Sequence, residues 1–387
     1  MTDTSLLSNS DAERMKTLRR DIHAHPELAF EEKRTSDLVA RTLEAAGIEV
    51  HRGIADTGLV GVLRNGDGPS IGLRADMDAL PILEAGGADH KSTHDGVMHA
   101  CGHDGHTAML LGAAEALAAS RAFKGNVYFI FQPAEENKGG GRVMVEEGLF
   151  ERFPCDAIFA LHNWPGLAAG KIAVQPGPMM ASFDTFDIVL KGVGGHAAMP
   201  EKARDPLVAA SEFVLALQTI VSRKLSAHDP AVLSVTQMKG GETFNVIPGQ
   251  CEVKGTWRCF DPEVRTFIRD EIDRILASVC AAHQIDYDAE YEFGYPSTIN
   301  TETEALFAAD VAKGVVGEGN VDTSFRPSMA SEDFSVMLEN VPGAYIWLGA
   351  GIEATPLHHP AYDFNDDTLE TGRDLLVSLV TRFSETR

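Results

Sequence analysis

The sequence predicts an α/β protein whose mixed, largely parallel sheet is flanked by helices and interrupted by an inserted α+β domain. Two observations predict this fold class. In the first half of the chain, short apolar segments typical of buried strands alternate with amphipathic helices. Near residue 183 the pattern changes to the order β-α-β-β-α-β, and near residue 296 the earlier pattern returns. We therefore expect a larger domain over 1–182 and 296–387 and an inserted domain over 183–295.

The larger domain begins with two predicted amphipathic helices, over about 10–25 and 31–46, and Gly47 follows the second as a helix C-cap. The next elements, in order, are strands in GLVGVLRNG and SIGLRADMDALP, a helix over about 107–119, a strand in NVYFIFQ, a helix over about 138–147 and a strand in DAIFALH. Strands that alternate with helices indicate a largely parallel sheet with helices on both faces, and ligands bind at the carboxyl ends of the strands in such sheets.

The inserted domain is predicted to contain four strands and two helices. Its strands lie in FDTFDIVLKG, AVLSVTQMKGG, GQCEVKGTWRCF and IDYDAEYEFG, and its helices in DPLVAASEFVLALQTIVSR and PEVRTFIRDEIDRILASVCAAH. The returning part of the larger domain is predicted to hold a helix in ETEALFAADVAKGVVG, a strand in GAYIWLGAG and a last helix in TLETGRDLLVSLVTRF.

The composition excludes several classes of function. The chain has 387 residues, is 44% hydrophobic and carries a net charge of -24, which argues against nucleic acid or an anionic membrane surface as a partner. The N-terminus lacks the pattern of a signal peptide, and no run of about 18 apolar residues occurs, so we expect a cytoplasmic protein. Five scattered cysteines argue against a disulfide framework.

Four clusters of polar residues follow predicted strands or open the helix after one. They are Cys101-Gly-His-Asp-Gly-His106, Gln132-Pro-Ala-Glu-Glu136, His162-Asn-Trp164 and Leu357-His-His-Pro360. Taken singly, a histidine such as His162 is more often a hydrogen-bonded loop residue, and adjacent glutamates are usually solvated. Because strand ends of one sheet converge in space, the four clusters together indicate a metal site.

The Glu135-Glu136 pair indicates hydrolytic chemistry. In an extended backbone, neighbouring side chains point to opposite sides, so one glutamate could bind a metal while the other faces the substrate. We expect this extended geometry because Pro133 disfavours an immediate helix. A carboxylate beside a metal-bound water, whose pKa the metal lowers to roughly 7, is suited to act as a general base.

The role of Cys101 stays open from its own motif. In an extended loop Cys101 and His103 would lie on one side and could bind metal together. The thiol could instead be a nucleophile with a histidine base, or a buried apolar residue. The carboxylates and histidines of the other clusters favour metal. Asp76 and Asp78, at a strand end, could orient a ligand histidine or cap a turn, and we assign the orienting role to Asp76.

Seven motifs, in order between Arg74 and Asp366, carry a resemblance to a known family. They are MHACGHDGHT, FQPAEENKGGG, ALHNWP, GGHAAMP, ETFNVIPG, SEDFS and LHHPAYDFND. They closely resemble the motifs of the metal-dependent aminoacylase and carboxypeptidase family, in the branch of hippurate hydrolases, N-acyl-amino-acid amidohydrolases and auxin-conjugate hydrolases. The resemblance implies a catalytic domain with two divalent ions and an inserted lid domain that also forms the contact of a homodimer or homotetramer.

The resemblance also implies roles for single residues. The implied metal ligands are Cys101, His103, Glu136, His162 and His358, and His359 occupies a variable position. Glu135 would be the general base that deprotonates the metal-bound water and later passes the proton to the leaving amine. Many relatives use an aspartate where this chain has Cys101. A thiolate favours zinc, but a carboxylate and imidazoles also accept manganese, nickel or cobalt, so the identity of the two ions stays open.

Three residues of the inserted domain match substrate-binding positions of the family. His196 corresponds to a histidine that reaches a neighbouring active site in relatives and stabilises the oxyanion or binds substrate. Without the resemblance, His196 would be interpreted as a turn residue. Asn245 and Arg258 match positions associated with the substrate's carboxylate.

The sequence thus predicts a metal-dependent amidohydrolase for small N-acyl-amino acids, such as hippurate-like or N-acetyl compounds. The nearest alternative is a dipeptidase or carboxypeptidase with the same dinuclear site. A cysteine hydrolase and a binding protein that kept the fold without catalysis are further alternatives.

Overall fold

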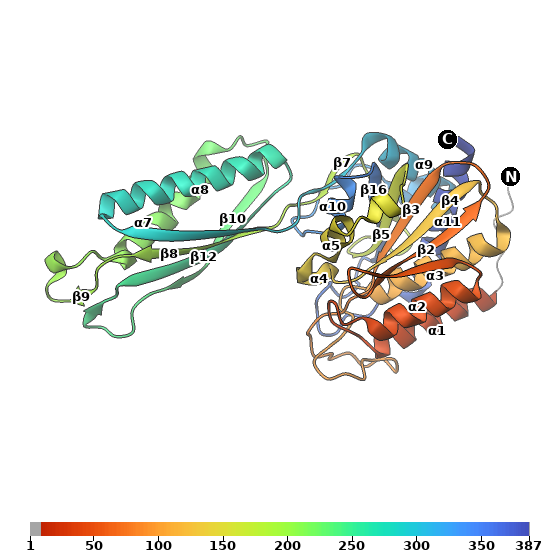
Figure 1. The fold of residues 1–387 in the computed structure, drawn as a ribbon, viewed down its shortest axis with the longest axis horizontal. Helices are drawn as coiled ribbons and strands as arrows, with labels where there is room; N and C mark the ends of the chain where they lie inside the picture. Colours follow the sequence, from red (N-terminus) through yellow and green to blue (C-terminus); the bar gives the residue numbers. More distant parts are fainter. Residues whose placement is uncertain (1–8, 387) are drawn as a thin grey trace. The chain divides into compact units, whose positions relative to one another are not determined.

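The chain forms two compact units in a computed structural model that describes residues 9–386 (Figure 1). The described part of unit 1 comprises residues 9–179, 299–326 and 333–386, and unit 2 comprises residues 180–298 and 327–332. The chain therefore enters unit 2 twice, whereas the sequence analysis places a single insertion at 183–295. The second segment belongs to unit 2 because the backbone N–H of Ala181 donates to the carbonyls of Ser328 and Ala330, at 3.1 and 3.0 Å. Residues 1–8 and 387, included in the predicted larger domain, lie outside the described residues.

An eight-stranded mixed sheet forms the centre of unit 1. Its order is β1 (Glu49–Ile54), β2 (Gly58–Asn65), β4 (Gly125–Gln132), β3 (Ser70–Asp76), β5 (Ala157–Pro165), β16 (Gly343–Gly351), β6 (Ile172–Ala173) and β15 (Val321–Asp322). The four central strands β4, β3, β5 and β16 run parallel, as predicted. Strands β1 and β2 extend the sheet in antiparallel fashion. The central residues of β4, 127–131, are all apolar and buried because helices cover both faces of the sheet.

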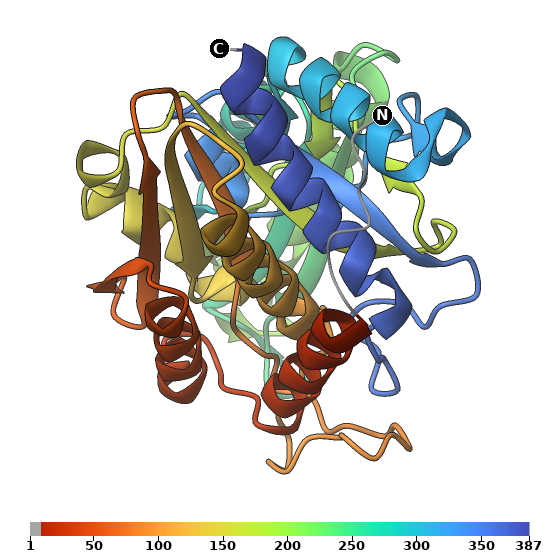
Figure 2. The same cartoon turned by 90° about the vertical axis from the view of Figure 1, so that its right-hand side faces the viewer.

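Helices cover the two faces of this sheet. One face is covered by α2 (Lys33–Ala45), α3 (His103–Ser120), α9 (Glu302–Val316) and α11 (Leu369–Thr386), and α1 (Asn9–Ala24) packs on α3 and α11 (Figure 2). The other face carries the short helices α5 (Gly140–Glu146) and α10 (Phe334–Leu338), with α4 (Glu135–Lys138) and α6 (Leu149–Arg152) beside α5 in the chain. Helix α3 begins four residues earlier than predicted, at His103. The predicted helix over 138–147 is divided at Gly139, whose φ of 65° ends α4.

Unit 2 is a four-stranded antiparallel sheet with two helices on one face. The order is β10 (Ala231–Lys239), β12 (Gln250–Cys259), β8 (Asp184–Lys191) and β13 (Asp286–Phe293). The helices are α7 (Pro206–Thr219), which continues as a π-helical turn at Ile220–Lys224, and α8 (Pro262–His283). Asp205 and Asp261 cap the two helices through their side chains, and each is followed by a proline at the first helical position. The predicted β-α-β-β-α-β order is found.

The remaining elements of the described chain are short. They are β7 (Gly177–Met180), β14 (Thr298–Asn300), the pair β9 (Gly195–His196) and β11 (Val246–Ile247), and 3-10 turns at Pro200–Lys202, Glu318–Asn320 and Asp366–Thr368. Within residues 9–386, no helix combines the length and apolar character needed to cross a lipid bilayer.

Candidate metal centre

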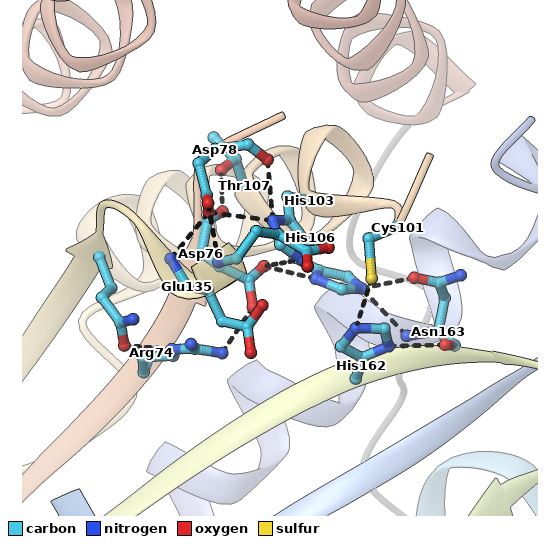
Figure 3. A network of polar contacts seen from close by, with 12 residues as sticks. Arg74, Asp76, Asp78, Cys101, His103, His106, Thr107, Glu135, His162 and Asn163 are labelled. Atoms are coloured by element: carbon cyan, nitrogen blue, oxygen red, sulfur yellow. Dashed lines mark hydrogen bonds and ion pairs between the residues drawn. The ribbon is translucent and has the colours of Figure 1, made fainter. Parts of the chain in front are cut away.

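Metal-competent side chains of unit 1 gather around the carboxyl ends of the parallel strands (Figure 3). The ligand atoms of Cys101, His103 and His162 lie within 4.8 Å of one another, and so do those of Cys101, Glu136 and His358. The five residues predicted as ligands therefore form two triads that share the thiol of Cys101. A shared ligand is the arrangement expected where one atom bridges two ions.

The loop before α3 directs Cys101 and His103 into the site through a bend rather than the extended geometry that the sequence analysis expected. Gly102 has a φ of 96°, and α3 begins at the next residue. A Cβ atom at position 102 would lie 2.2 Å from Oδ1 of Asn163, so this position requires glycine for space as well as for conformation. Cys101 and His103 face the same site because the chain turns sharply between them.

The two buried histidines of the first triad are held in the tautomer that a metal ligand needs. Nδ1 of His103 donates to the backbone carbonyl of Asp78 at 2.9 Å, and Nδ1 of His162 donates to the carbonyl of Asn163 at 2.7 Å. Each ring therefore presents Nε2 to the site. Nε2 of His162 lies 3.4 Å from Sγ of Cys101, and Nε2 of His103 is buried without a hydrogen-bond partner. These donor atoms fit a bound cation.

The electrostatics around His103 favour positive charge, whereas those around His162 favour the neutral imidazole. Burial lowers the pKa of His103, but the carboxylates of Asp76, Asp78 and Glu136 outweigh it and raise the pKa to about 10. Burial and the nearby His106 hold the pKa of His162 well below its ordinary value. The carboxylates that stabilise a proton on His103 would also stabilise a metal cation beside it.

Glu135 and Glu136 lie in the first turn of α4, not in the extended segment that the sequence analysis expected. Strand β4 ends before Pro133, as predicted, but Ala134 then adopts a left-handed conformation with a φ of 55°, and the helical turn begins directly after it. In a helical turn adjacent side chains diverge by less than in a strand. Both carboxylates consequently reach within 4.8 Å of the ring of His103. The expectation that they face opposite sides is wrong in this respect.

The two adjacent histidines after β16 differ in their surroundings. Nε2 of His358 lies 3.0 Å from Oε1 of Glu136, and the backbone N–H of His358 donates to the carbonyl of Ala100 at 2.8 Å. His359 instead accepts a hydrogen bond through Nδ1 from the backbone N–H of Ala361. The geometry therefore supports the choice of His358 as the ligand.

Asp76 supports the site through a different neighbour from the one that its assigned role suggests. Its Oδ1 accepts from Nδ1 of His106 at 2.6 Å, whereas Nε2 of His103 lies 3.9 Å away. Burial opposes ionisation of Asp76, but His103, Arg74 and His106 outweigh it and hold its pKa well below the ordinary value. Asp78, which was not selected from the sequence, contacts His103 directly: its Oδ1 lies 3.2 Å from Nδ1.

A buried polar network around Arg74, next to the site, was not predicted from the sequence. Arg74 donates to Gln132 at 2.9 Å, to Asp76 at 2.6 Å and to Asp333 at 3.1 Å. Oδ2 of Asp333 accepts from the backbone N–H of Gly141 at 2.8 Å, which ties α5 to this network. The alternation of Arg74 and Asp76 within an otherwise apolar strand was an available signal, because a charge pair in a buried strand must be compensated locally.

The predicted substrate residues of unit 2 fall into two separate places. His196 pairs with Val246 across β9 and β11, and the backbone N–H of Ala197 donates to the carbonyl of Asn245 at 3.0 Å, so His196 and Asn245 are neighbours.

Arg258 lies eight residues beyond Gln250 along β12, roughly 26 Å at about 3.3 Å per residue. Its guanidinium lies 4.7 Å from the ring centre of Phe183. Within one chain the structure does not bring Arg258 together with Asn245.

The family description "Peptidase family M20/M25/M40" matches residues 72–382 of the chain. The chain belongs to this family. The match spans the central strands of unit 1, the whole of unit 2 and the returning segments, and it therefore includes all the residues predicted as ligands.

Several members of the M20 family are similar to the chain over nearly its whole length. The hippurate hydrolase of Campylobacter jejuni is 42% identical over 95% of this chain and 95% of the relative. The N-acetylcysteine deacetylase of Bacillus subtilis is 39% identical over 96% of this chain and 97% of the relative. The crystal structure of the Bacillus subtilis YXEP protein, described as a dinuclear metal-binding peptidase from the M20 family, is 35% identical, covers 98% of this chain and 100% of that chain, and superposes with a TM-score of 0.87.

Proposed function

We propose that this protein is a metal-dependent amidohydrolase that cleaves N-acyl-amino acids to a carboxylate and a free amino acid. The observation that carries the proposal is the pair of triads that share Cys101, with the carboxylate of Glu135 beside them. The relatives that act on hippurate and on N-acetylcysteine support this class of substrate. Both compounds present an acyl group, an amide bond and a free α-carboxylate.

Two divalent ions would be held by the five residues of these triads, which are Cys101, His103, Glu136, His162 and His358. When bound, such ions polarise the amide carbonyl and lower the pKa of water to roughly 7. A thiolate ligand favours zinc, and the imidazole and carboxylate ligands also suit manganese, cobalt or nickel.

Glu135 is proposed to move the proton of the reaction. Its side chain is buried, and its position is set by the hydrogen bond from its own backbone N–H to Oδ1 of Asp78, at 3.1 Å. The carboxylate would accept a proton from the attacking water and return it to the nitrogen of the leaving amino acid. Asp76 would support the site from behind, through His106.

The residues of unit 2 are proposed to bind substrate. The imidazole of His196 would stabilise the oxyanion, and the side chains of Asn245 and Arg258 would hold carboxylate groups. Because Arg258 and Asn245 lie far apart in one chain, we propose that subunits of a homodimer or homotetramer supply them to one site. The exposed apolar side chains of Val208 and Leu215 on α7, 55% and 72% exposed, support assembly through unit 2. We also propose that the protein is located in the cytoplasm.

Metal removal and substrate comparison test this function together. Chelation should abolish hydrolysis of benzoyl-glycine and of N-acetyl amino acids, and added zinc, manganese, cobalt or nickel should restore it. Hydrolysis that survives full chelation would contradict a metal-dependent reaction and favour a thiol nucleophile. Unblocked dipeptides should be poor substrates. Faster cleavage of dipeptides than of acylated amino acids would instead establish a dipeptidase with the same site.

A further inference from the structure

The turn that carries Glu135 and Glu136 is held by two buried carboxylates from elsewhere in unit 1. Three consecutive backbone N–H groups point to them. The N–H of Ala134 donates to Oε1 of Glu32 at 2.9 Å, and the N–H groups of Glu135 and Glu136 donate to the carboxylate of Asp78 at 3.1 and 2.9 Å. Asp78 also contacts His103, whereas Glu32 accepts hydrogen bonds from backbone N–H groups and from the hydroxyl of Thr57.

This turn needs such support because of its first residue. Ala134 has a φ of 55° and a ψ of 41°, a left-handed conformation that is unfavourable for any residue except glycine. A non-glycine residue stays in this region only where its surroundings over-determine it. The carbonyl of Ala134 accepts from the N–H of Gly140 at 2.9 Å, so hydrogen bonds hold both sides of the residue.

Glu32 directs its side chain away from the helix that it begins. It occupies the N-cap position of α2, yet its side chain makes no capping hydrogen bond there. The carboxylate of Glu27 binds the first amides of α2 instead, from Arg34 and Thr35, both at 2.8 Å. Glu32 is fully buried, and its oxygens accept from the N–H of Phe30, from the N–H of Ala134 and from the hydroxyl of Thr57.

Burying a carboxylate is costly unless it is paired with a positive charge or well hydrogen-bonded. Burial raises the pKa of Glu32 to about 7, despite three hydrogen-bond donors. A methionine or leucine would fill the same space at lower cost if the position served packing alone. Of the three hydrogen bonds that its carboxylate accepts, the one from Ala134 connects Glu32 to the turn that carries Glu135 and Glu136.

We propose that Glu32 is a positioning residue for the Ala134–Glu136 turn, and through that turn for the general base Glu135 and the metal ligand Glu136. The inference rests on the roles given to these two glutamates in the proposed function. Glu32 acts through the backbone of Ala134 and contacts no reacting group.

The test compares Glu32→Ala and Glu32→Gln with Glu27→Ala in the full-length protein. Glu32→Ala removes the acceptor of Ala134, so kcat on benzoyl-glycine should fall about 10- to 100-fold while KM changes little. Glu32→Gln keeps an oxygen acceptor at Oε1 and should recover most of kcat. Glu27→Ala removes a carboxylate that also binds two amides of the same segment, and it should lower thermal stability without lowering kcat.

A second readout requires no substrate. Cobalt-reconstituted wild-type protein and variants are compared by visible absorption, which reports the ligand geometry around the ion. Glu32→Ala should shift the spectrum because Glu136 moves, whereas Glu27→Ala should leave it unchanged. If Glu32→Ala does not fold, Glu32→Asp, whose shorter side chain keeps the charge but pulls back from Ala134, replaces it with the same expected direction.

The outcomes separate the two proposals. A wild-type spectrum and wild-type kcat in Glu32→Ala would overturn the positioning role, and so would an equal loss of kcat in Glu27→Ala at equal loss of stability. A shifted cobalt spectrum in a protein that hydrolyses no acylated amino acid would support the positioning of Glu136 while rejecting the proposed substrate class.

Discussion

The predicted functional residues of unit 1 and those of unit 2 differ in how they are held. In unit 1 the first triad is buried, whereas Glu136 is half-buried and His358 is exposed. His103 and Asp78 are fixed by hydrogen bonds to residues far from them in the chain. In unit 2, His196 on β9 and Asn245 directly before β11 are exposed, and Phe244 next to Asn245 is 97% exposed. The metal centre is thus pre-organised within one chain. The side chains of His196 and Asn245 instead accept hydrogen bonds from nearby residues of their own loops, Ala198 and Thr243.

The largest effect expected from the unit 1 site comes from Glu135→Gln. The substitution preserves shape but removes the proton acceptor, so kcat should fall at least about 10³-fold. Metal content, measured by elemental analysis, should stay at the wild-type level because Glu135 is assigned to proton transfer rather than ligation. Loss of metal together with activity would show that Glu135 is a ligand. It would contradict the assignment of proton transfer to Glu135 and of metal binding to Glu136.

A pair of substitutions tests which of the two adjacent histidines, His358 or His359, is the metal ligand. His358→Ala removes the imidazole that lies against Glu136, and bound metal should drop substantially. His359→Ala removes a ring that accepts a hydrogen bond from Ala361 of its own loop, and metal content should change little. Equal losses in the two variants would reject the choice of His358.

Mixing two inactive variants tests whether His196 acts in the active site of a neighbouring subunit. If His196 acts in a neighbouring subunit, a mixture of His196→Ala and Glu135→Gln subunits should regain a fraction of wild-type activity, because half of the sites in a heterodimer combine an intact base with an intact histidine. Subunit exchange is verified separately with labelled protein. Exchange without any regained activity would place His196 in the site of its own chain.

The smallest expected effect is a pH-dependent change in the free energy of unfolding, caused by the buried carboxyl of Glu32. Burial raises the pKa of Glu32 to about 7 from an ordinary 4.5, so its protonated form is favoured by folding. Its contribution to the free energy of unfolding is complete below about pH 4.5 and is lost as the pH rises through 7. Glu32→Gln cannot ionise, so its stability relative to wild type should increase between pH 5 and pH 8, by at most about 3 kcal/mol.

Chemical denaturation at several pH values measures this difference. Glu242→Gln, which changes an exposed carboxyl near Asn245, is the matched control and should show no comparable change with pH. A pH-independent difference for Glu32→Gln would mean that the carboxyl of Glu32 is solvated, contrary to its complete burial.

Much of the fold follows from local patterns in the sequence. The apolar strand β4 and its neighbours predicted a largely parallel sheet, and the change of pattern near residue 183 predicted a second fold of the type β-α-β-β-α-β. The family and the amidohydrolase class are confirmed by the family match and by the relatives. The roles of single site residues stay predictions.

The rest of the site depends on tertiary contacts that no local pattern encodes. An alanine has no intrinsic preference for the left-handed region, so the turn at Ala134 depends on tertiary hydrogen bonds, among them the one to Glu32, about a hundred residues earlier. The same turn placed both glutamates of α4 near His103, against the extended geometry expected from Pro133. The contact between Asp78 and His103 likewise arises only when β3 and α3 are packed.

The double passage of the chain through unit 2 has a consequence for protein engineering. A shortened protein made by joining residue 179 directly to residue 299 would still carry residues 327–332, whose backbone partners at Met180 and Ala181 would be gone. Backbone N–H and C=O groups that lose their partners in this way are free to pair with another chain, which promotes aggregation. Replacing unit 2 with that of a relative therefore requires transferring both of its segments, 180–298 and 327–332. The backbone hydrogen bonds between the two segments are then kept.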